Sequence, residues 1–204
     1  MNPAQQTEAL IAAGRLFHSR GWVPASGGNF SFRTSHEHLL ITASGTHKGE
    51  LGAEDLMQVD LEGRAIGSAR RSSAETLLHC QIYRRFHDVG AVLHTHSVPS
   101  TVLSRRQSAV ILQGYELLKI LPGIDTHETA VEIPVFENDQ DIARLAGRVD
   151  AAQAGGEGLC GYLIAGHGLY AWGRDVAEAR YRVEALEFMF DSELQTELLA
   201  RTTK

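Results

Sequence analysis

The sequence predicts a single α/β domain, and three of its features support this prediction. The chain has 204 residues, of which 43% are hydrophobic, and this is enough for one domain with a sizeable core. Segments with the spacing of amphipathic helices, such as residues 4–20, alternate with short apolar runs that are typical of buried strands, such as residues 90–97. We find no internal repeat, low-complexity segment or linker that would divide residues 1–204.

Charge and cysteine content limit the class of protein. A net charge of -6 disfavours a general surface for nucleic acid or anionic membranes, so we expect a small molecule as partner. Cys80 and Cys160 each lie in an apolar periodic segment and are predicted to be buried free thiols, which is typical of a cytoplasmic protein. We expect no signal peptide and no membrane span, because the first residues lack a basic-then-apolar pattern and no apolar run approaches 18 residues.

The first helix is predicted over residues 4–20, where four apolar side chains recur at helical spacing: Leu10, Ala13, Leu16 and Phe17. Gly21 ends it. The loop Ser26-Gly27-Gly28-Asn29-Phe30-Ser31 follows, and the alternating Phe30 and Phe32 then predict a strand. Gly28 and Asn29 could form an anion cradle with their backbone N–H groups, or the loop could be a plain turn.

A second small, polar loop follows the predicted strand 39–43. It reads Ser44-Gly45-Thr46-His47-Lys48-Gly49 and supplies hydroxyls, glycine N–H groups and a lysine ammonium, which are the donors that a phosphate needs. His47 is interpreted as a loop residue rather than as a ligand. Residues 57–61 and 64–67, separated by Glu62-Gly63, are expected to form a hairpin without chemistry.

The segment Ser72-Ser73-Ala74-Glu75 is predicted to open a helix that runs to about Phe86. Its spacing is that of a capping box, with Ser72 as N-cap and Glu75 at N3, and this would give Glu75 a purely structural role. A helix N-terminus with serines also attracts anions. Because Glu75 comes just before the next strand, it could instead reach the chemistry at the end of that strand. Both interpretations stay open.

Two apolar runs end in histidine. Residues 90–97 predict a strand in which His94 and His96 project from the same face, roughly 7 Å apart, while Thr95 points to the other. A second run, Leu163 to Gly168, ends in His167 between two glycines, which let backbone and ligand approach closely. Three histidines at the ends of buried strands suit a catalytic zinc, which takes three protein ligands and leaves one position open.

The rest of the chain supplies further elements and one more acidic candidate. A short helix to about residue 105 and a strand over residues 109–112 precede Gln113-Gly114-Tyr115-Glu116, and Glu116 just past a strand end could overlook the site. Pro134 makes residues 131–136 an expected edge strand. The remaining predictions are a helix over residues 139–153, a hairpin of residues 160–165 and 169–172, and a long final helix opened by a capping box at Asp175 and Glu178.

The motifs Ser-Gly-Gly-Asn-Phe-Ser, Thr-Ala-Ser-Gly-Thr, Ser-Ala-Glu, His-Thr-His-Ser and Gly-His-Gly, in this order, resemble the class II (zinc-dependent) aldolase family. The resemblance implies a three-layer α/β/α fold with a largely antiparallel sheet and helices on both faces, usually as a homotetramer. It implies one Zn²⁺ per subunit on three histidines and phosphate contacts from both loops and the helix start. The zinc residues are His94, His96 and His167. The phosphate residues are Asn29, Ser44, Gly45 and Thr46, with Ser72 or Ser73 at the helix start, and the donor chemistry of the two loops adds Gly28 and Lys48.

Within the family, Gln113-Gly114-Tyr115-Glu116 and Ile133-Pro134-Val135-Phe136-Glu137-Asn138 resemble the dehydratases more than the aldolases. The resemblance implies loss of water from a phosphorylated ketose, with Glu116 removing the C3 proton and protonating the leaving C4 hydroxyl. Glu75 matches the position that serves aldolases as base and metal neighbour. A sugar-phosphate aldolase is the alternative, and a family-like binding domain without catalysis is a third possibility.

Overall fold

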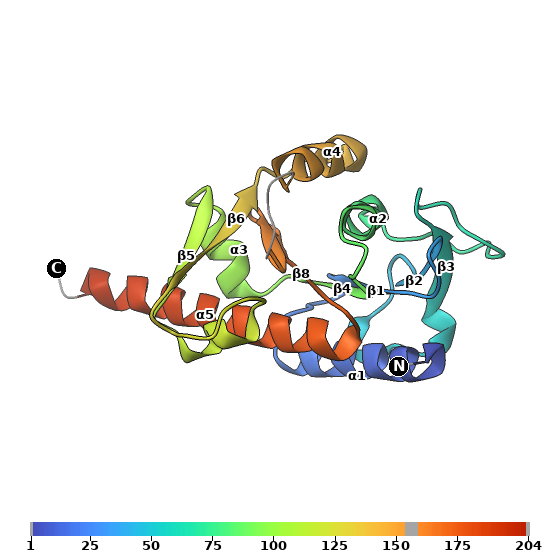
Figure 1. The fold of residues 1–204 in the computed structure, drawn as a ribbon. Coiled ribbons are helices and arrows are strands. Elements are labelled where there is room, and N and C mark those ends of the chain that lie inside the picture. Colours follow the sequence, from blue (N-terminus) through green and yellow to red (C-terminus); the bar gives the residue numbers. More distant parts are fainter. Residues whose placement is uncertain (1, 154–158, 203–204) are drawn as a thin grey trace.

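The structure is a computed structural model, and it describes residues 2–153 and 159–202. Within these residues, eight strands form one mixed sheet in the order β3-β2-β1-β4-β8-β7-β6-β5 (Figure 1). All neighbouring strands pair antiparallel except β6 and β7, which are parallel. The largely antiparallel sheet that the family resemblance implied is therefore confirmed.

The strands are short and the helices differ widely in length. The strands are β1 (Asn29–Arg33), β2 (His38–Thr42), β3 (Leu56–Asp60), β4 (Ala91–Thr95), β5 (Ala109–Gln113), β6 (Ala130–Phe136), β7 (Gly161–Ile164) and β8 (Gly168–Gly173). The α-helices are α1 (Pro3–Ser19), α2 (Thr76–Arg85), α3 (Val98–Ser104), α4 (Ile142–Ala152) and α5 (Val176–Thr202). Short 3₁₀ helices among the described residues are η1 (Lys48–Glu50), η2 (Ala53–Asp55) and η3 (Glu116–Ile120).

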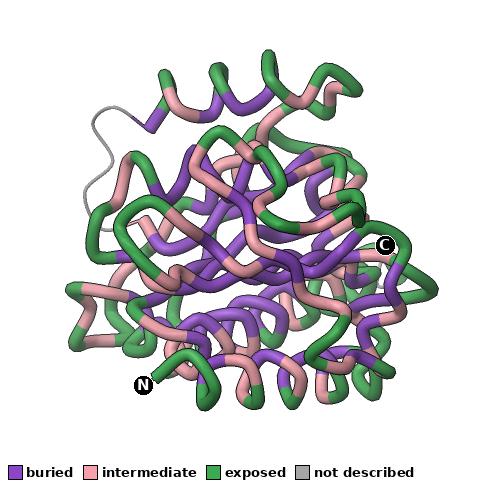
Figure 2. Tube along the Cα trace, turned by 90° about the vertical axis from the view of Figure 1, so that its right-hand side faces the viewer, coloured by how far each residue is buried: buried purple, intermediate pink, exposed green. Residues whose placement is uncertain are grey.

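The sheet carries a separate apolar core on each face, which makes three layers. Side chains alternate between the faces of a strand, so Leu93 of β4 joins the core under α1, α3 and α5, while Val92 joins the core under α2 and α4. Figure 2 shows buried segments running through the middle of the molecule, with more exposed helical segments above and below. The same alternation decides which face the histidines of β4 occupy.

Most of the predicted elements are present, within a few residues of their expected ends. Helix α1 begins with Asn2 as its N-cap, and it buries Leu10, Ala13 and Phe17. Cys80 and Cys160 are free and buried, as expected. None of the described helices is long and apolar enough to cross a membrane.

The expectation that residues 131–136 form an edge strand because of Pro134 is wrong. Strand β6 lies between β5 and β7, and β5 is at the edge of the sheet. The proline is tolerated because Val135 N donates toward β5, to Ser108 O, so the nitrogen of Pro134 faces the β7 side. On that side the ladder begins only at Val135, and no donor is needed at Pro134.

Two predicted features, the hairpin over residues 57–67 and the capping box at the start of α5, are only partly present. The hairpin expected over residues 57–67 consists of β3 and one isolated bridge between Val59 and Ala65. At the start of α5, Asp175 Oδ1 accepts from Glu178 N at 2.9 Å, while the Glu178 carboxylate accepts from Arg174 N at 2.6 Å. The reciprocal half of that capping box is therefore replaced by a bond to the preceding residue.

Candidate metal centre

Three histidine side chains converge at one end of the sheet. His94 is the fourth residue of β4 and His96 lies just past its end, while His167 occupies the turn between β7 and β8. Because β8 pairs with both β4 and β7, this turn lies beside the end of β4. The Nε2 atom of His96 lies 2.8 Å from that of His94 and 3.1 Å from that of His167, and the third separation is 3.4 Å.

These separations fit a shared metal ion. Tetrahedral ligands at about 2.0 to 2.1 Å from zinc are about 3.3 Å from one another, close to the spacing of the three Nε2 atoms. The Nδ1 of His94 lies 2.8 Å from Leu169 O and donates to it, which leaves the Nε2 lone pair for a metal. Burial lowers the pKa of His96 to about 3 and also lowers the pKa of His94, so both rings are neutral ligands at neutral pH.

Glu75 joins the three histidines, so of the two interpretations left open for it the capping box is wrong. Helix α2 begins only at Thr76, and the side chain of Glu75, which occupies the N-cap position, makes no capping hydrogen bond. Ser72 instead forms a β-bridge with Ala43, which holds it outside the helix. The Glu75 carboxylate lies 2.9 Å from His167 Nε2 and 3.3 Å from His94 Nε2, so four ligand atoms lie within 4.8 Å of one another.

Two neutral donors hold the Glu75 carboxylate in place. Asn29 Nδ2 donates to Oε2 at 2.6 Å, and Tyr170 Oη donates to the same oxygen at 3.0 Å. Burial raises the pKa of Glu75, but the neighbouring His94 and His167 outweigh it and hold this pKa well below its usual range. The carboxylate is therefore ionised at neutral pH, and it can bind a cation or accept a proton from a bound substrate.

A buried polar chain that the sequence analysis missed orients Asn29. His79 Nε2 hydrogen-bonds Asn29 Oδ1, His79 Nδ1 lies 2.7 Å from Ser31 Oγ, and Ser31 Oγ lies 2.9 Å from Tyr83 Oη. A carboxylate only accepts, so Glu75 requires the amide group of Asn29 to face it. This choice makes His79 Nε2 the donor to Asn29 and Ser31 the donor to His79.

Glycines in the recognised motifs allow close backbone approach around the histidines. A Cβ on Gly168 would lie 1.9 Å from Thr95 O, so β8 could not pair with β4 at this point with any larger residue. Gly28 has φ +75, and a Cβ there would lie 2.6 Å from His94 O. The glycines therefore bring the loop before β1 and the turn before β8 against the histidine strand.

A pocket of about 190 Å³, which we call the loop pocket, adjoins His96. It is lined by Ser26, Gly27, Gly28, Asn29, Ala43, Ser44, Gly45, Lys48, Ser73, Ala74, Glu75 and His96. Six of the predicted phosphate contacts are therefore together: Gly28, Asn29, Ser44, Gly45, Lys48 and Ser73. Thr46 and Ser72 do not line it, and the hydroxyl of Thr46 donates to Ala43 O at 2.9 Å within its own turn.

Lys48 supplies the positive charge of the loop pocket. Its Nζ donates to Thr46 O at 2.7 Å and to Ser26 O at 2.9 Å, so the two polar loops are tied together and one N–H remains for a ligand. Burial lowers the pKa of Lys48 to about 8, against the opposing effect of the Glu75 and Asp55 charges. The ammonium is therefore charged at neutral pH and loses its proton in mildly alkaline solution.

We expect the KM of a phosphorylated substrate to rise with pH above about 8, because Lys48 then loses the positive charge that would attract a phosphate in the loop pocket. The rise approaches about tenfold per pH unit where Lys48 alone determines binding. Steady-state kinetics between pH 7 and 9.5 would measure it, with Lys48→Met as the variant in which KM is high and flat. An equal alkaline rise in Lys48→Met would contradict this role.

The structure does not bring Glu116 to the histidines of the same chain. Glu116 begins η3, its side chain is 70% exposed, and it pairs with Lys119 at 2.6 Å and His127 at 3.1 Å. Strand β5 is four strands from β4, roughly 19 Å at about 4.8 Å per strand. Strands β6 and β7 both end on the side of the His167 turn, and β5 runs antiparallel to them. The last residue of β5 therefore lies at the opposite end of the strands from the His167 turn.

Comparison with known proteins identifies the family. The family described as "Class II Aldolase and Adducin N-terminal domain" matches residues 8–194. The chain belongs to the class II aldolase family. It is similar to the class II aldolase fold of L-fuculose-1-phosphate aldolase from Thermus thermophilus, with a TM-score of 0.79 and 28% identity over 97% of each chain.

Two relatives are much nearer in sequence than this aldolase. The chain is 50% identical to methylthioribulose-1-phosphate dehydratase from Pseudomonas paraeruginosa over 98% of each chain. It is 56% identical to the dehydratase of the same name from Methylococcus capsulatus over 90% of each chain. Within the class II aldolase family, the chain is therefore more similar to these dehydratases than to the aldolase, as its Gln113–Glu116 and Ile133–Asn138 motifs predicted.

Proposed function

We propose that this chain is a hydro-lyase that removes water from 5-methylthioribulose 1-phosphate, giving 5-methylthio-2,3-diketopentyl 1-phosphate in methionine salvage. The observation that carries the proposal is the convergence of three histidines and an ionised carboxylate beside a pocket lined by N–H, hydroxyl and ammonium donors. Identity of about half the residues with dehydratases over nearly the full chain supports this substrate. We propose that it acts in the cytoplasm, as an enzyme of methionine salvage.

His94, His96 and His167 would hold the metal, and Glu75 would stand at or beside the fourth position. We propose one Zn²⁺ per subunit, because three imidazoles with an open position are typical of catalytic zinc. The ion supplies a Lewis acid that polarises the carbonyl of a ketose. Tyr170 and Asn29 keep the Glu75 carboxylate turned toward the histidines.

The loop pocket would hold the phosphate and thereby place the ketose. Gly28, Ser44, Gly45 and Ser73 offer N–H and hydroxyl donors, and Lys48 adds a charge. Because His96 and Glu75 also line this pocket, a phosphate bound there sets the first carbons of the substrate at the candidate metal centre. Ser72 and Thr46 would act indirectly, by holding the loops in shape.

Glu116 remains our candidate for the proton transfers, and its position requires a second subunit. In its own chain Glu116 follows the edge strand β5 and lies at the opposite end of the strands from the histidines. It could therefore act only in the site of a neighbouring subunit. We therefore propose a homo-oligomer, a tetramer as the family resemblance implied, in which Glu116 of one subunit removes the C3 proton and protonates the leaving C4 hydroxyl in the next. Its exposure leaves it available for this contact.

Mixing two inactive variants tests this arrangement. Glu116→Gln keeps the metal ligands, and His94→Ala keeps Glu116, so each homo-oligomer should be inactive. If the two groups act across a subunit boundary, oligomers reassembled from an equal mixture contain some sites with both groups intact. We expect activity to return in the mixture, measured after dissociation and reassembly. Two variants that stay inactive when co-assembly is demonstrated would contradict the shared site.

The nature of the products tests the reaction itself. Incubation with methylthioribulose 1-phosphate should give the diketone phosphate with one equivalent of water, detectable by mass spectrometry as a loss of about 18 Da. The alternative is an aldolase, which uses the same metal but breaks the C3–C4 bond. Dihydroxyacetone phosphate with a thioether aldehyde would establish aldol cleavage and overturn the proposal. No turnover by the zinc-loaded protein would favour a non-catalytic binding domain.

A further inference from the structure

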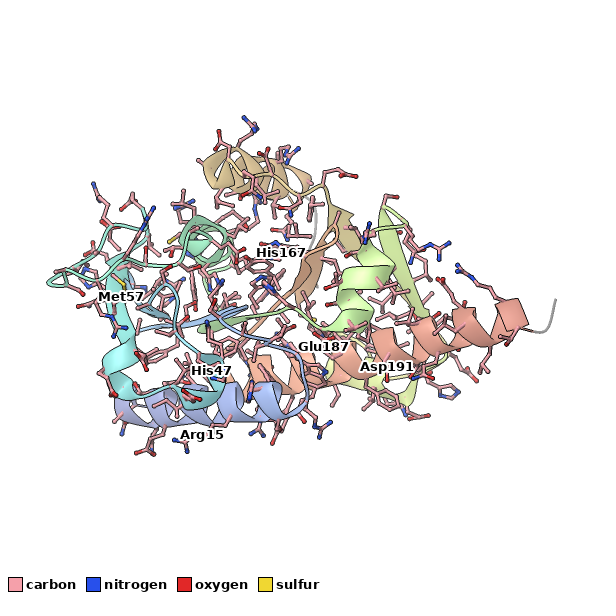
Figure 3. All side chains as sticks on the ribbon, turned by 180° about the vertical axis from the view of Figure 1, so that it is seen from behind. Arg15, His47, Met57, His167, Glu187 and Asp191 are labelled. Carbon is pink, nitrogen blue, oxygen red and sulfur yellow. The ribbon has the colours of Figure 1, made fainter. Side chains whose placement is uncertain are left out.

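A buried carboxylate lies behind the histidine strand, on the face of the sheet opposite the metal ligands. Glu187 of α5 is 1% exposed, and both of its oxygens accept hydroxyl hydrogens: Thr95 Oγ1 donates to Oε1 at 2.5 Å and Ser97 Oγ donates to Oε2. In Figure 3, Glu187 lies on α5 on one side of the sheet and His167 lies on the other. The catalytic steps proposed above do not use this residue.

The two hydroxyls belong to the residues that alternate with the histidines. Along His94-Thr95-His96-Ser97 the rings face the candidate metal centre, whereas the two hydroxyls face α5. Glu187 therefore holds the strand on both sides of His96, just where β4 ends and regular sheet pairing no longer fixes the backbone.

The same contact reaches the third histidine through α3. Ser97 is the N-cap of α3 and accepts from Ser100 N at 3.1 Å. Further along this helix, Thr101 Oγ1 donates to His167 O at 3.0 Å, and Ser104 Oγ accepts from Gly166 N at 3.0 Å. By holding Ser97, Glu187 thus fixes the start of α3, the helix whose side chains hydrogen-bond the backbone of the His167 turn.

A purely structural explanation of Glu187 is costly. Among the described residues no lysine, arginine or histidine forms an ion pair with it, and an ionised carboxylate buried without a cation loses its hydration. Burial raises its pKa to about 7, against the lowering by the hydroxyls of Ser97 and Thr95. An apolar side chain would pack at this position without that cost, as Val183 and Phe190 do on the same face of α5.

We propose that Glu187 is a positioning residue that sets the mutual placement of the three metal-binding histidines, acting through Thr95 and Ser97, and so determines metal affinity. The inference rests on the proposed function only in taking the histidines as a metal centre. Partners that orient ligands typically contribute about 10- to 100-fold in metal affinity. Glu187→Met, which removes both acceptors at similar volume, should raise the Zn²⁺ dissociation constant by about this factor, and Glu187→Gln, which keeps one acceptor, by less.

The test measures Zn²⁺ affinity by competition with a chelator of known affinity, together with the visible absorption of the Co²⁺-loaded protein, which reports ligand geometry. Glu184→Gln is the control, because Glu184 lies one turn earlier on α5 and, within the described part of the chain, forms its ion pair with Arg180, at 3.3 Å. We expect weaker Zn²⁺ binding and a changed Co²⁺ spectrum in Glu187→Met, and wild-type values in Glu184→Gln. Wild-type affinity and spectrum in folded Glu187→Met would overturn the inference.

A second set of variants tests the route and does not depend on the folding of Glu187→Met. Thr95→Val with Ser97→Ala removes the two hydroxyls and should weaken Zn²⁺ binding to the same extent, and adding Glu187→Met should then have little further effect. Wild-type affinity in the hydroxyl variant, or fully additive effects, would refute the route. Failure of the wild-type chain to bind Zn²⁺ is a different result, because it would refute the metal centre and the proposed function as well.

Discussion

Replacing His94, His96 or His167 by alanine should remove bound zinc and lower kcat/KM by about 10³-fold or more. In the proposed centre each ring supplies one of the three imidazole ligands, so removing any ring leaves the ligand set incomplete. A Lewis acid contributes several kcal/mol to such a reaction, and each 1.4 kcal/mol is about a factor of ten in rate. Metal content by elemental analysis and steady-state kinetics on the same preparations would check both effects.

The exposed His87, which follows α2, supplies the matched control. His87→Ala should keep both its zinc and its turnover. Chelation of the wild type should reproduce the loss, and added Zn²⁺ should restore activity in the wild type but not in the three variants. Full zinc content in His167→Ala would exclude that residue as a ligand and leave Glu75 in its place.

Glu75→Gln should lower kcat by about 10²-fold or more, because the carboxylate stands at or beside the fourth position of the proposed metal centre and can also accept a proton there. The neutral amide can neither accept a proton nor balance the charge of a metal. Its NH₂ group can also face Asn29 Nδ2 and Tyr170 Oη, which are both donors to the carboxylate. Because the Glu75 side chain makes no capping hydrogen bond to α2, we expect the melting temperature to change little.

Glu178→Gln is a suitable comparison, since Glu178 is a partly buried carboxylate of α5 that pairs with Arg174 and Arg182 far from the histidines. It should affect stability more than turnover. Zinc loss in Glu75→Gln would assign Glu75 to metal binding, whereas retained zinc without turnover would assign it to proton transfer. Near-normal kcat in Glu75→Gln would contradict both roles.

The sequence was sufficient to predict the histidine centre because its geometry is local. The period of a strand places His94 and His96 on one face, and the glycines about His167 indicate a tight turn. The sequence alone could not predict that β4 pairs with β8, which brings the His167 turn beside His94 and His96. The two polar loops were predictable for the same reason, as each is a short run of small donors between elements.

The errors arose where distant contacts overrode a local pattern. Ser72 and Glu75 have the spacing of a capping box, but Ser72 pairs with Ala43, and Glu75 binds Asn29 and Tyr170, which are 46 and 95 residues away. No local signal reports such partners. Likewise, Pro134 is harmless in an inner strand only because of where the pairing with β7 starts.

For Glu116 and Glu187, too, the local sequence could not predict which residues each side chain lies near. Glu116 follows a strand as expected, but the direction of β5 in the sheet decides which edge it reaches. Glu187 did leave a signal, since it lies four residues after Val183 and three before Phe190, on the apolar stripe of its helix. A lone acid on such a stripe indicates a buried partner without telling which one.

The amide of Asn29 lies between two sites, since Nδ2 donates to Glu75 at 2.6 Å and to Ser73, a residue of the loop pocket, at 3.2 Å. An anion that accepts a hydrogen bond from the Ser73 hydroxyl changes the hydrogen bond between Ser73 and Asn29 Nδ2. It thereby also changes the hydrogen bond by which Asn29 holds the Glu75 carboxylate. Linkage makes such an effect reciprocal: whatever factor a bound phosphate applies to metal affinity, the metal applies to phosphate affinity. The two halves of the proposed substrate site would therefore form one thermodynamic unit.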